Sequence, residues 1–97
     1  MTFDWDDGNR DKCSKHGMTA HEIEHVLSHR PLVAPDGKHS SAEQRLVAVG
    51  RTAEGRPAFV VFCWRGDRMR PVSARFMHAR EARRYDLAQD RSGDDHG

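Results

Sequence analysis

Three apolar segments joined by two tight turns occupy the second half of the chain. They cover residues 45–52, 57–65 and 68–76, and their residue period of two is typical of β-strands. Glu54-Gly55 and Gly66-Asp67 provide the turns, and such short connections join neighbouring antiparallel strands. The sequence therefore predicts an antiparallel meander as the centre of the fold.

The middle and last of these segments differ in character. Residues 58–64 are apolar throughout, which predicts a central strand covered on both faces. The last segment contains Pro71, which cannot donate a ladder hydrogen bond, so it predicts an edge strand or a bulge. Its side chains alternate, with one face formed by Val72, Ala74 and Phe76 and the other by Ser73 and Arg75. One face is thus expected to pack and the other to carry chemistry.

Two helices are expected before the sheet. The first begins at a cap from Asp6 or Asp7 and is ended by Gly17. The second follows a capping box of Thr19 and Glu22 and runs to about residue 28. A polar loop is expected over 35–44.

A third helix, over about 78–88, follows the sheet. Its packing stripe consists of Met77, Glu81, Tyr85 and Ala88. The predicted fold class is α+β, with two N-terminal helices, an antiparallel sheet of three to four strands and a C-terminal helix. Residues 1–88 form one domain, and residues 89–97 form a flexible acidic tail.

Neither the cysteines nor the hydropathy indicates secretion or a membrane. Cys13 and Cys63 do not form a closely spaced pair, so no disulfide framework is expected. No apolar run approaches the ~18 residues that a membrane span requires, and the N-terminus has no basic, apolar secretory signal. The expected location is the cytoplasm.

Positive charge is concentrated near the end of the meander. Seven arginines and only two carboxylates lie between residues 65 and 85, a local balance of +5 in a chain of net charge +1. Guanidinium groups keep their charge and match the geometry of phosphate oxygens. This predicts a phosphate-binding surface, with a plain solvated face as the alternative.

The segment His21-Glu22-Ile23-Glu24-His25 matches the H-E-x-x-H pattern of zinc proteases. At about 100° per residue, Ile23 and Val26 lie on the buried face, and both histidines lie roughly opposite. No third ligand is evident, so no metal site is predicted. There are two weaker alternatives. One is adventitious metal binding by an exposed row of histidines, and the other is a zinc-dependent hydrolase.

Short motifs in a fixed order resemble those of the BrnT toxin family. They span about residues 3–86 and comprise Phe3-Asp4-Trp5-Asp6, Lys15-His16-Gly17-Met18-Thr19, Glu43-Gln44-Arg45 before a strand ending at Gly50, Arg65-Gly66-Asp67-Arg68-Met69-Arg70, Ser73-Ala74-Arg75, Arg80-Glu81 and Arg84-Tyr85. The resemblance implies a RelE-like ribonuclease, the growth-inhibiting toxin of a type II toxin-antitoxin pair. It also implies a BrnA-like ribbon-helix-helix antitoxin as partner, RNA as substrate, and operator DNA bound only through the antitoxin.

Metal-independent RNA cleavage needs a base for the 2′-hydroxyl, donors for the phosphate and an acid for the leaving oxygen. Arg75 and Arg65 are the candidates for binding the phosphate. His16 and Glu81 are the candidates for acid and base, because an imidazole, with its ordinary pKa of about 6.5, exchanges protons near neutrality. Tyr85, one turn after Glu81, is a candidate for orienting it or stacking on a base. No cofactor is expected.

Five further cations are predicted to bind RNA: Lys15, Arg68, Arg70, Arg80 and Arg84. Each catalytic candidate also has a structural alternative. Glu81 can cap the last helix, Tyr85 can belong to the core, and His16 can interact with a helix dipole. A non-catalytic module that binds nucleic acid or a partner is therefore the alternative function.

Overall fold

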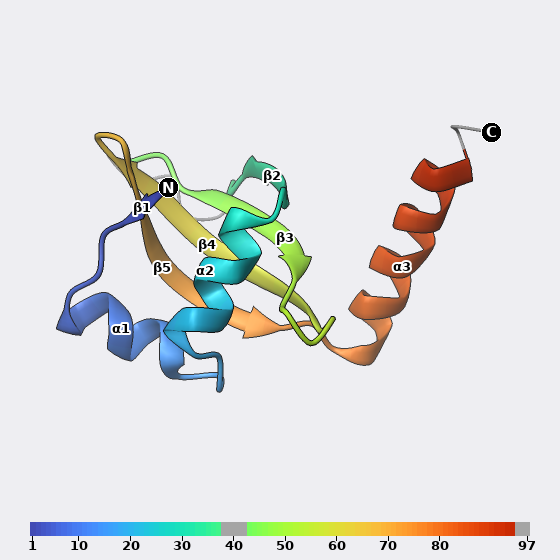
Figure 1. Ribbon diagram of the computed structural model, residues 1–97, viewed down its shortest axis with the longest axis horizontal. Helices are drawn as coiled ribbons and strands as arrows, with labels where there is room; N and C mark the ends of the chain where they lie inside the picture. Colours follow the sequence, from blue (N-terminus) through green and yellow to red (C-terminus); the bar gives the residue numbers. More distant parts are fainter. Residues whose placement is uncertain (38–42, 95–97) are drawn as a thin grey trace.

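The computed structural model describes residues 1–37 and 43–94. Its elements in chain order are β1 (Thr2–Phe3), α1 (Asp7–Ser14), α2 (Ala20–Ser28), β2 (Leu32–Pro35), β3 (Leu46–Arg51), β4 (Pro57–Arg65), β5 (Arg68–Phe76) and α3 (Ala79–Asp94). The α+β class is confirmed, with two helices before the meander and one after it (Figure 1).

The described strands form one mixed sheet in the order β1-β5-β4-β3-β2. The predicted meander of β3, β4 and β5 is confirmed, with Gly55 and Gly66 at positive φ in its turns. The sheet has five strands where three to four were expected, and β1 pairs with β5 in parallel. The additional strands β1 and β2 are two and four residues long, too short to produce a readable period.

The strand β2 was not predicted, and it overlaps the expected loop over 35–44 only at Pro35. Leu32–Pro35 pairs antiparallel with β3 and forms one edge of the sheet. Proline is tolerated there because an edge strand has one side without ladder partners. Leu32 and Val33 are 55% and 50% exposed, so this edge is apolar and open. The predicted loop otherwise falls partly on residues 38–42, outside the described residues.

The helices α1 and α2 cover one face of the sheet (Figure 1). Both predicted caps are confirmed: the Asp6 side chain accepts from the Asn9 amide, and Thr19 and Glu22 form the reciprocal capping box. The core between these helices and the sheet contains Cys13, Met18, Ile23, Val26, Leu27, Ala48, Ala58, Val60, Phe62, Met69 and Ala74. Both cysteines are buried and free.

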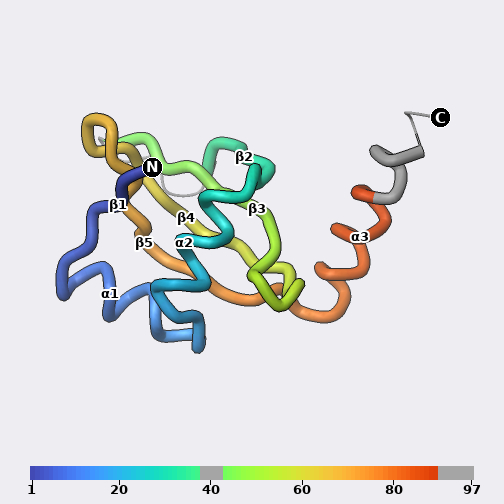
Figure 2. The backbone as a smooth tube through the Cα atoms, in the orientation of Figure 1, coloured from blue at the N-terminus to red at the C-terminus, as the bar shows by residue number. Residues whose placement is uncertain are grey.

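The opposite face of the sheet, here called the open face, is not covered by these helices. On β4, Val60 and Phe62 point into the core, whereas Phe59 and Val61 on the open face are only half-buried. The expectation that β4 is covered on both faces was therefore wrong. The reason is that α3 leads away from the sheet rather than lying across it (Figures 1 and 2).

The helix α3 is longer than expected and packs lightly. It continues past Ala88 to Asp94, so part of the predicted tail is helical, while residues 95–97 lie outside the described residues. Its contacts with the sheet include an ion pair from Asp86 to Arg51, whose guanidinium lies 5.0 Å from the centre of the Tyr85 ring. None of the described helices is long and apolar enough to cross a bilayer.

The predicted irregularity at Pro71 is a bulge, not a sheet edge. The β4–β5 register shifts where Phe62 pairs with Pro71, which leaves Val72 without a partner. The bulge removes Val72 from the packing row expected for it, and it lines a surface pocket instead. β5 lies inside the sheet because β1 occupies its other side.

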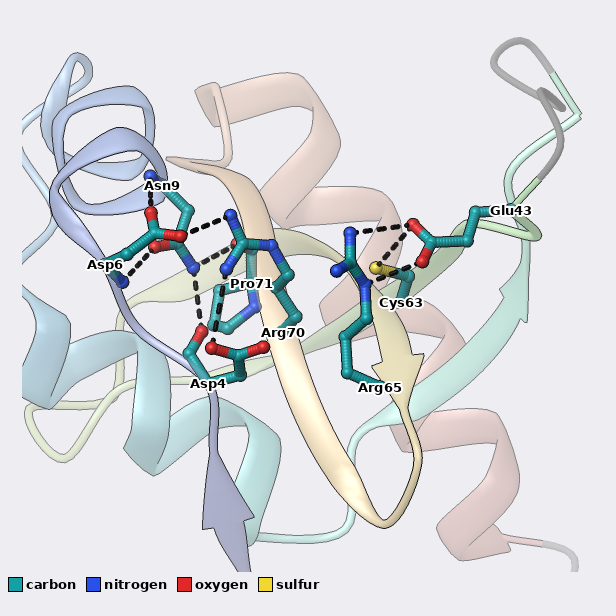
Figure 3. A network of polar contacts seen from close by, with 8 residues as sticks. All are labelled: Asp4, Asp6, Asn9, Glu43, Cys63, Arg65, Arg70 and Pro71. Atoms are coloured by element: carbon teal, nitrogen blue, oxygen red, sulfur yellow. Dashed lines mark hydrogen bonds and ion pairs between the residues drawn. The ribbon is translucent and has the colours of Figure 1, made fainter.

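Asn9 ties this bulge to the N-terminal segment (Figure 3). Its Nδ2 donates to the carbonyl oxygens of Pro71 and Asp4, both at 2.9 Å. Its Oδ1 accepts from the Asp6 amide at 2.7 Å, and the side chain is 4% exposed. A single buried amide thus joins α1, the segment after β1 and the bulge in β5.

Candidate functional site

Arg75 lies on the open face, where it pairs across the strands with Phe59. Its Nη1 and Nη2 donate to the two carboxylate oxygens of Glu81, each at 2.8 Å. The guanidinium carbon also lies 4.6 Å from the centre of the Phe59 ring. The bidentate contact and the aromatic ring fix the orientation of this cation.

Glu81 lies in the first turn of α3 and has a second partner. The backbone amide of His78 donates to its Oε1 at 2.9 Å. The hydrogen bonds from Arg75, and then from His78, lower the pKa of Glu81 to about 2. Glu81 therefore caps the helix, as its structural alternative proposed, and also contacts Arg75. At neutral pH it is a carboxylate.

His16 lines the same pocket as Arg75. The pocket has a volume of about 110 Å³, and Phe59 and Ser73 complete this part of its lining. His16 is exposed in the turn after α1, where Gly17 adopts a φ of +89° that ends the helix. Arg75 thus joins Glu81 on one side to the pocket of His16 on the other.

Tyr85 lies in a neighbouring pocket of about 390 Å³ that also contains Glu81 and Arg84. Phe59 lines this pocket and that of His16, so the two adjoin around its ring. Tyr85 is half-buried where α3 contacts the sheet, and it is not part of the main core. We call the two pockets together the Arg75 site.

Arg65 lies elsewhere on the open face. Its Nε is 2.6 Å from Oε1 of Glu43, and the Cys63 thiol donates to the same carboxylate at 3.5 Å (Figure 3). Arg65 follows Phe59 by six residues on β4, which corresponds to about 20 Å at 3.3 Å per residue. The structure therefore does not bring Arg65 into the Arg75 site.

The predicted RNA-binding cations divide between the two ends of the open face. Lys15 is exposed beside His16, Arg80 is exposed at the start of α3, and Arg84 lines the Tyr85 pocket. Arg68 and Arg70 lie near the β4–β5 turn, where Arg70 is held by Asp4 and Asp6. The five predicted RNA-binding cations therefore do not form a single cluster.

Several polar residues at the two ends of the open face were not predicted as site residues. Glu43 and Arg45 entered the sequence interpretation only as part of a motif, and Asn9, Lys12 and Arg51 did not enter it as site residues. The polar type of Asn9 at the third position of a helix capped by Asp6 signals the capping box. The contact of Asn9 with β5 has no local signal, because it joins residues 62 positions apart.

The H-E-x-x-H segment lies on α2, away from the residues above. His21 is exposed, and His25 stacks on His29 with ring centroids 3.7 Å apart. His29 Nδ1 lies 2.7 Å from the backbone oxygen of His25. Across residues 1–37 and 43–94, no group of three or more potential ligands is placed to hold a metal ion.

Replacing Glu81 with Gln should make stability less dependent on pH. The folded-state pKa of about 2 lies below the ordinary value of 4.5, so the ionised form stabilises the fold above pH 4.5, and this contribution disappears as pH falls toward 2. Thermal unfolding followed by circular dichroism should show Glu81→Gln below wild type near neutrality, with the difference shrinking below pH 4.5. Glu54→Gln, at an exposed turn, is the control. A constant difference down to pH 2 would contradict the linkage.

Comparison with known proteins assigns the family of the chain. The family model described as "Ribonuclease toxin, BrnT, of type II toxin-antitoxin system" matches residues 5–81, most of the chain. Searches among curated proteins and among solved structures gave no match. The matched region includes His16, Arg65, Arg75 and Glu81. The chain belongs to the BrnT family of ribonuclease toxins of type II toxin-antitoxin systems.

Proposed function

We propose that this chain is a RelE-like endoribonuclease that cleaves RNA at the Arg75 site without a metal ion. The observation that carries the proposal is the placement of Arg75, which contacts Glu81 and shares a pocket with His16. Arg75 and His16 line one small pocket, and Glu81 lines the adjoining one. A guanidinium, a carboxylate and an imidazole are the group types that phosphodiester cleavage requires. Family membership supports the substrate class.

In this mechanism the scissile phosphate binds Arg75. The 2′-hydroxyl oxygen attacks phosphorus and loses its proton, while the bond to the 5′-oxygen breaks and that oxygen takes up a proton. The products are a 2′,3′-cyclic phosphate and a 5′-hydroxyl. Because Glu81 is ionised at neutral pH, it accepts the first proton, and a protonated His16 donates the second.

Phosphate binding also affects the strength of the base. The Arg75 hydrogen bonds are the largest cause of the low pKa of Glu81. A phosphate that takes over these donors raises this pKa toward its ordinary value, and the carboxylate becomes a better proton acceptor. Tyr85 lines the adjoining pocket with Phe59, and we assign it to stacking against a neighbouring base.

The proposed partner is a BrnA-like antitoxin that covers part of the open face and brings operator DNA into the complex. Family membership supports an antitoxin as the partner, since the family consists of toxins of type II toxin-antitoxin systems. Coexpression with the neighbouring antitoxin should give a co-purifying complex and relieve growth arrest. Unrelieved arrest, with no complex recovered, would argue against this partner.

Incubating the purified chain with RNA tests the proposal directly. Cleavage should continue at an unchanged rate in EDTA and yield products with 2′,3′-cyclic phosphate ends, because the site uses side chains for proton transfer. Products are identified by gel electrophoresis and mass spectrometry. Loss of cleavage on chelation, restored by a divalent cation, would support a metal enzyme instead.

The alternative of a binding module makes a different prediction for the same assay. A module binds RNA with strong salt dependence but forms no cleavage product, and it keeps its affinity when His16 and Glu81 are replaced. An RNA-binding wild-type chain without any cleavage would therefore favour the module.

A further inference from the structure

A second pocket lies on the open face, at the end opposite the Arg75 site. Its volume is about 280 Å³, and four cationic side chains line it: Lys12, Arg45, Arg65 and Arg70. They come from α1, the segment before β3, β4 and β5, so the cluster exists only in the folded chain. The carboxylate of Glu43 also lines it, and Cys63 and Val72 provide apolar lining.

Two of these cations are held in place by carboxylates (Figure 3). Both Nε and Nη2 of Arg65 contact Glu43, at 2.6 Å and 3.3 Å. Arg70 is 2.9 Å from Asp6 and 3.5 Å from Asp4, and its side chain is 19% exposed. The three carboxylates orient these two guanidinium groups and exceed their charge by one.

The other two cations retain their charges. The side chains of Lys12 and Arg45 form no ion pair with any residue in the described part of the chain. Lys12 is exposed, and Arg45 is half-buried at the start of the sheet. Four cations against three paired carboxylates leave a net charge of +1 around the pocket, above two fixed guanidinium groups, an arrangement that favours an anion.

The β4 residues of the open face between this pocket and the Arg75 site are apolar, with Phe59 and Val61 half-buried and Cys63 buried. Phe59, Val61, Cys63 and Arg65 alternate onto the open face of β4, which spans about 20 Å. Val61 is flanked by Val47 of β3 and Ser73 of β5. Unpaired bases can pack against such a surface, whereas the bases of a duplex are stacked inside.

We propose that the pocket of Lys12, Arg45, Arg65 and Arg70 is a second phosphate subsite, which binds an RNA backbone phosphate several nucleotides from the scissile bond. The subsite rests on the proposed function for its ligand. With this subsite, the substrate is an extended single strand. Arg65 then binds that strand away from the scissile phosphate. Long RNA should therefore bind much better than RNA that reaches only the Arg75 site.

The test compares two lengths of 2′-O-methyl RNA, which lacks the attacking hydroxyl and remains intact. Oligonucleotides of about three and about twelve nucleotides are titrated by competition in fluorescence anisotropy. Lys12→Ala/Arg45→Ala should reduce the affinity advantage of the long RNA by about tenfold. It should also reduce the salt slope for the long RNA by about 0.7, since the subsite binds one phosphate and each lost single-strand phosphate contact removes about 0.7.

Arg10→Ala is the matched control, because Arg10 lies on the same helix as Lys12 but faces Trp5, at 5.6 Å from its ring centre. It should keep the wild-type length advantage and salt slope. A Lys12→Ala/Arg45→Ala variant with native circular dichroism and both wild-type values would overturn the subsite. Equal competition by polyglutamate of similar length would also overturn it, in favour of an acidic protein segment. Absence of cleavage by wild type would count against the proposed function alone, since this comparison measures binding.

Discussion

Replacing Arg75 with Ala should lower RNA cleavage by about 10²- to 10³-fold, the loss typical of removing one donor that stabilises charge in the transition state. Among the described residues, Arg75 is the one cation that contacts Glu81 and also lines the pocket of His16. Its loss removes the proposed phosphate ligand and the group that orients the carboxylate. Initial rates on one RNA, with circular dichroism of each variant, measure the effect.

Two controls separate chemistry from charge. Arg10→Ala removes the same charge far from the site, beside Trp5, and should cleave like wild type. Arg75→Lys keeps the charge but loses the fork that contacts both oxygens of Glu81, so its rate should lie between those of wild type and Arg75→Ala. A folded Arg75→Ala chain that cleaves at the wild-type rate would refute the assignment of this site.

Asn9→Asp should reduce the free energy of unfolding by about 3 to 5 kcal/mol, the range for an uncompensated buried charge. The two side chains have nearly the same shape, but a carboxylate cannot donate to the carbonyl oxygens of Asp4 and Pro71. The new charge would also lie beside Asp6, whose side chain caps the same turn. Urea unfolding monitored by tryptophan fluorescence gives the value.

Asp11→Asn is the matched control for this variant. It exchanges the same two residue types at an exposed position of α1 and should change stability by less than about 0.5 kcal/mol. If Asn9→Asp proves as stable as wild type near neutral pH, the Asn9 side chain does not bind the bulge through donated hydrogen bonds.

The predicted and observed folds differ where elements are short or project from the rest. Residues 32–35 have too few positions to show a period, and their pairing with β3 becomes visible only when β3 itself is placed. The length of α3 was missed because the acidic composition of its end suggested fraying, although no proline or glycine interrupts residues 79–92. The assignment of residues 32–35 as a strand therefore depends on their pairing with β3.

The site was partly predictable. His16, Arg75 and Glu81 were chosen because RNA cleavage needs their group types. Arg75 contacts Glu81 and shares a pocket with His16, whereas Glu81 lines the adjoining pocket. Arg65 was grouped with them because it stands at the turn before the strand of Arg75, but its distance along β4 separates it. Sequence proximity to a turn does not reveal which end of a strand approaches which helix.

By itself, the sequence determined the local features of this protein. Turn glycines, capping boxes and the period of two depend on contacts within a few residues, so the helix starts and the meander could be read directly. Only the tertiary structure decided that α3 leaves one face of the sheet open and that two groups of cations lie at opposite ends of it. These features depend on packing between distant segments, which local residue patterns do not encode.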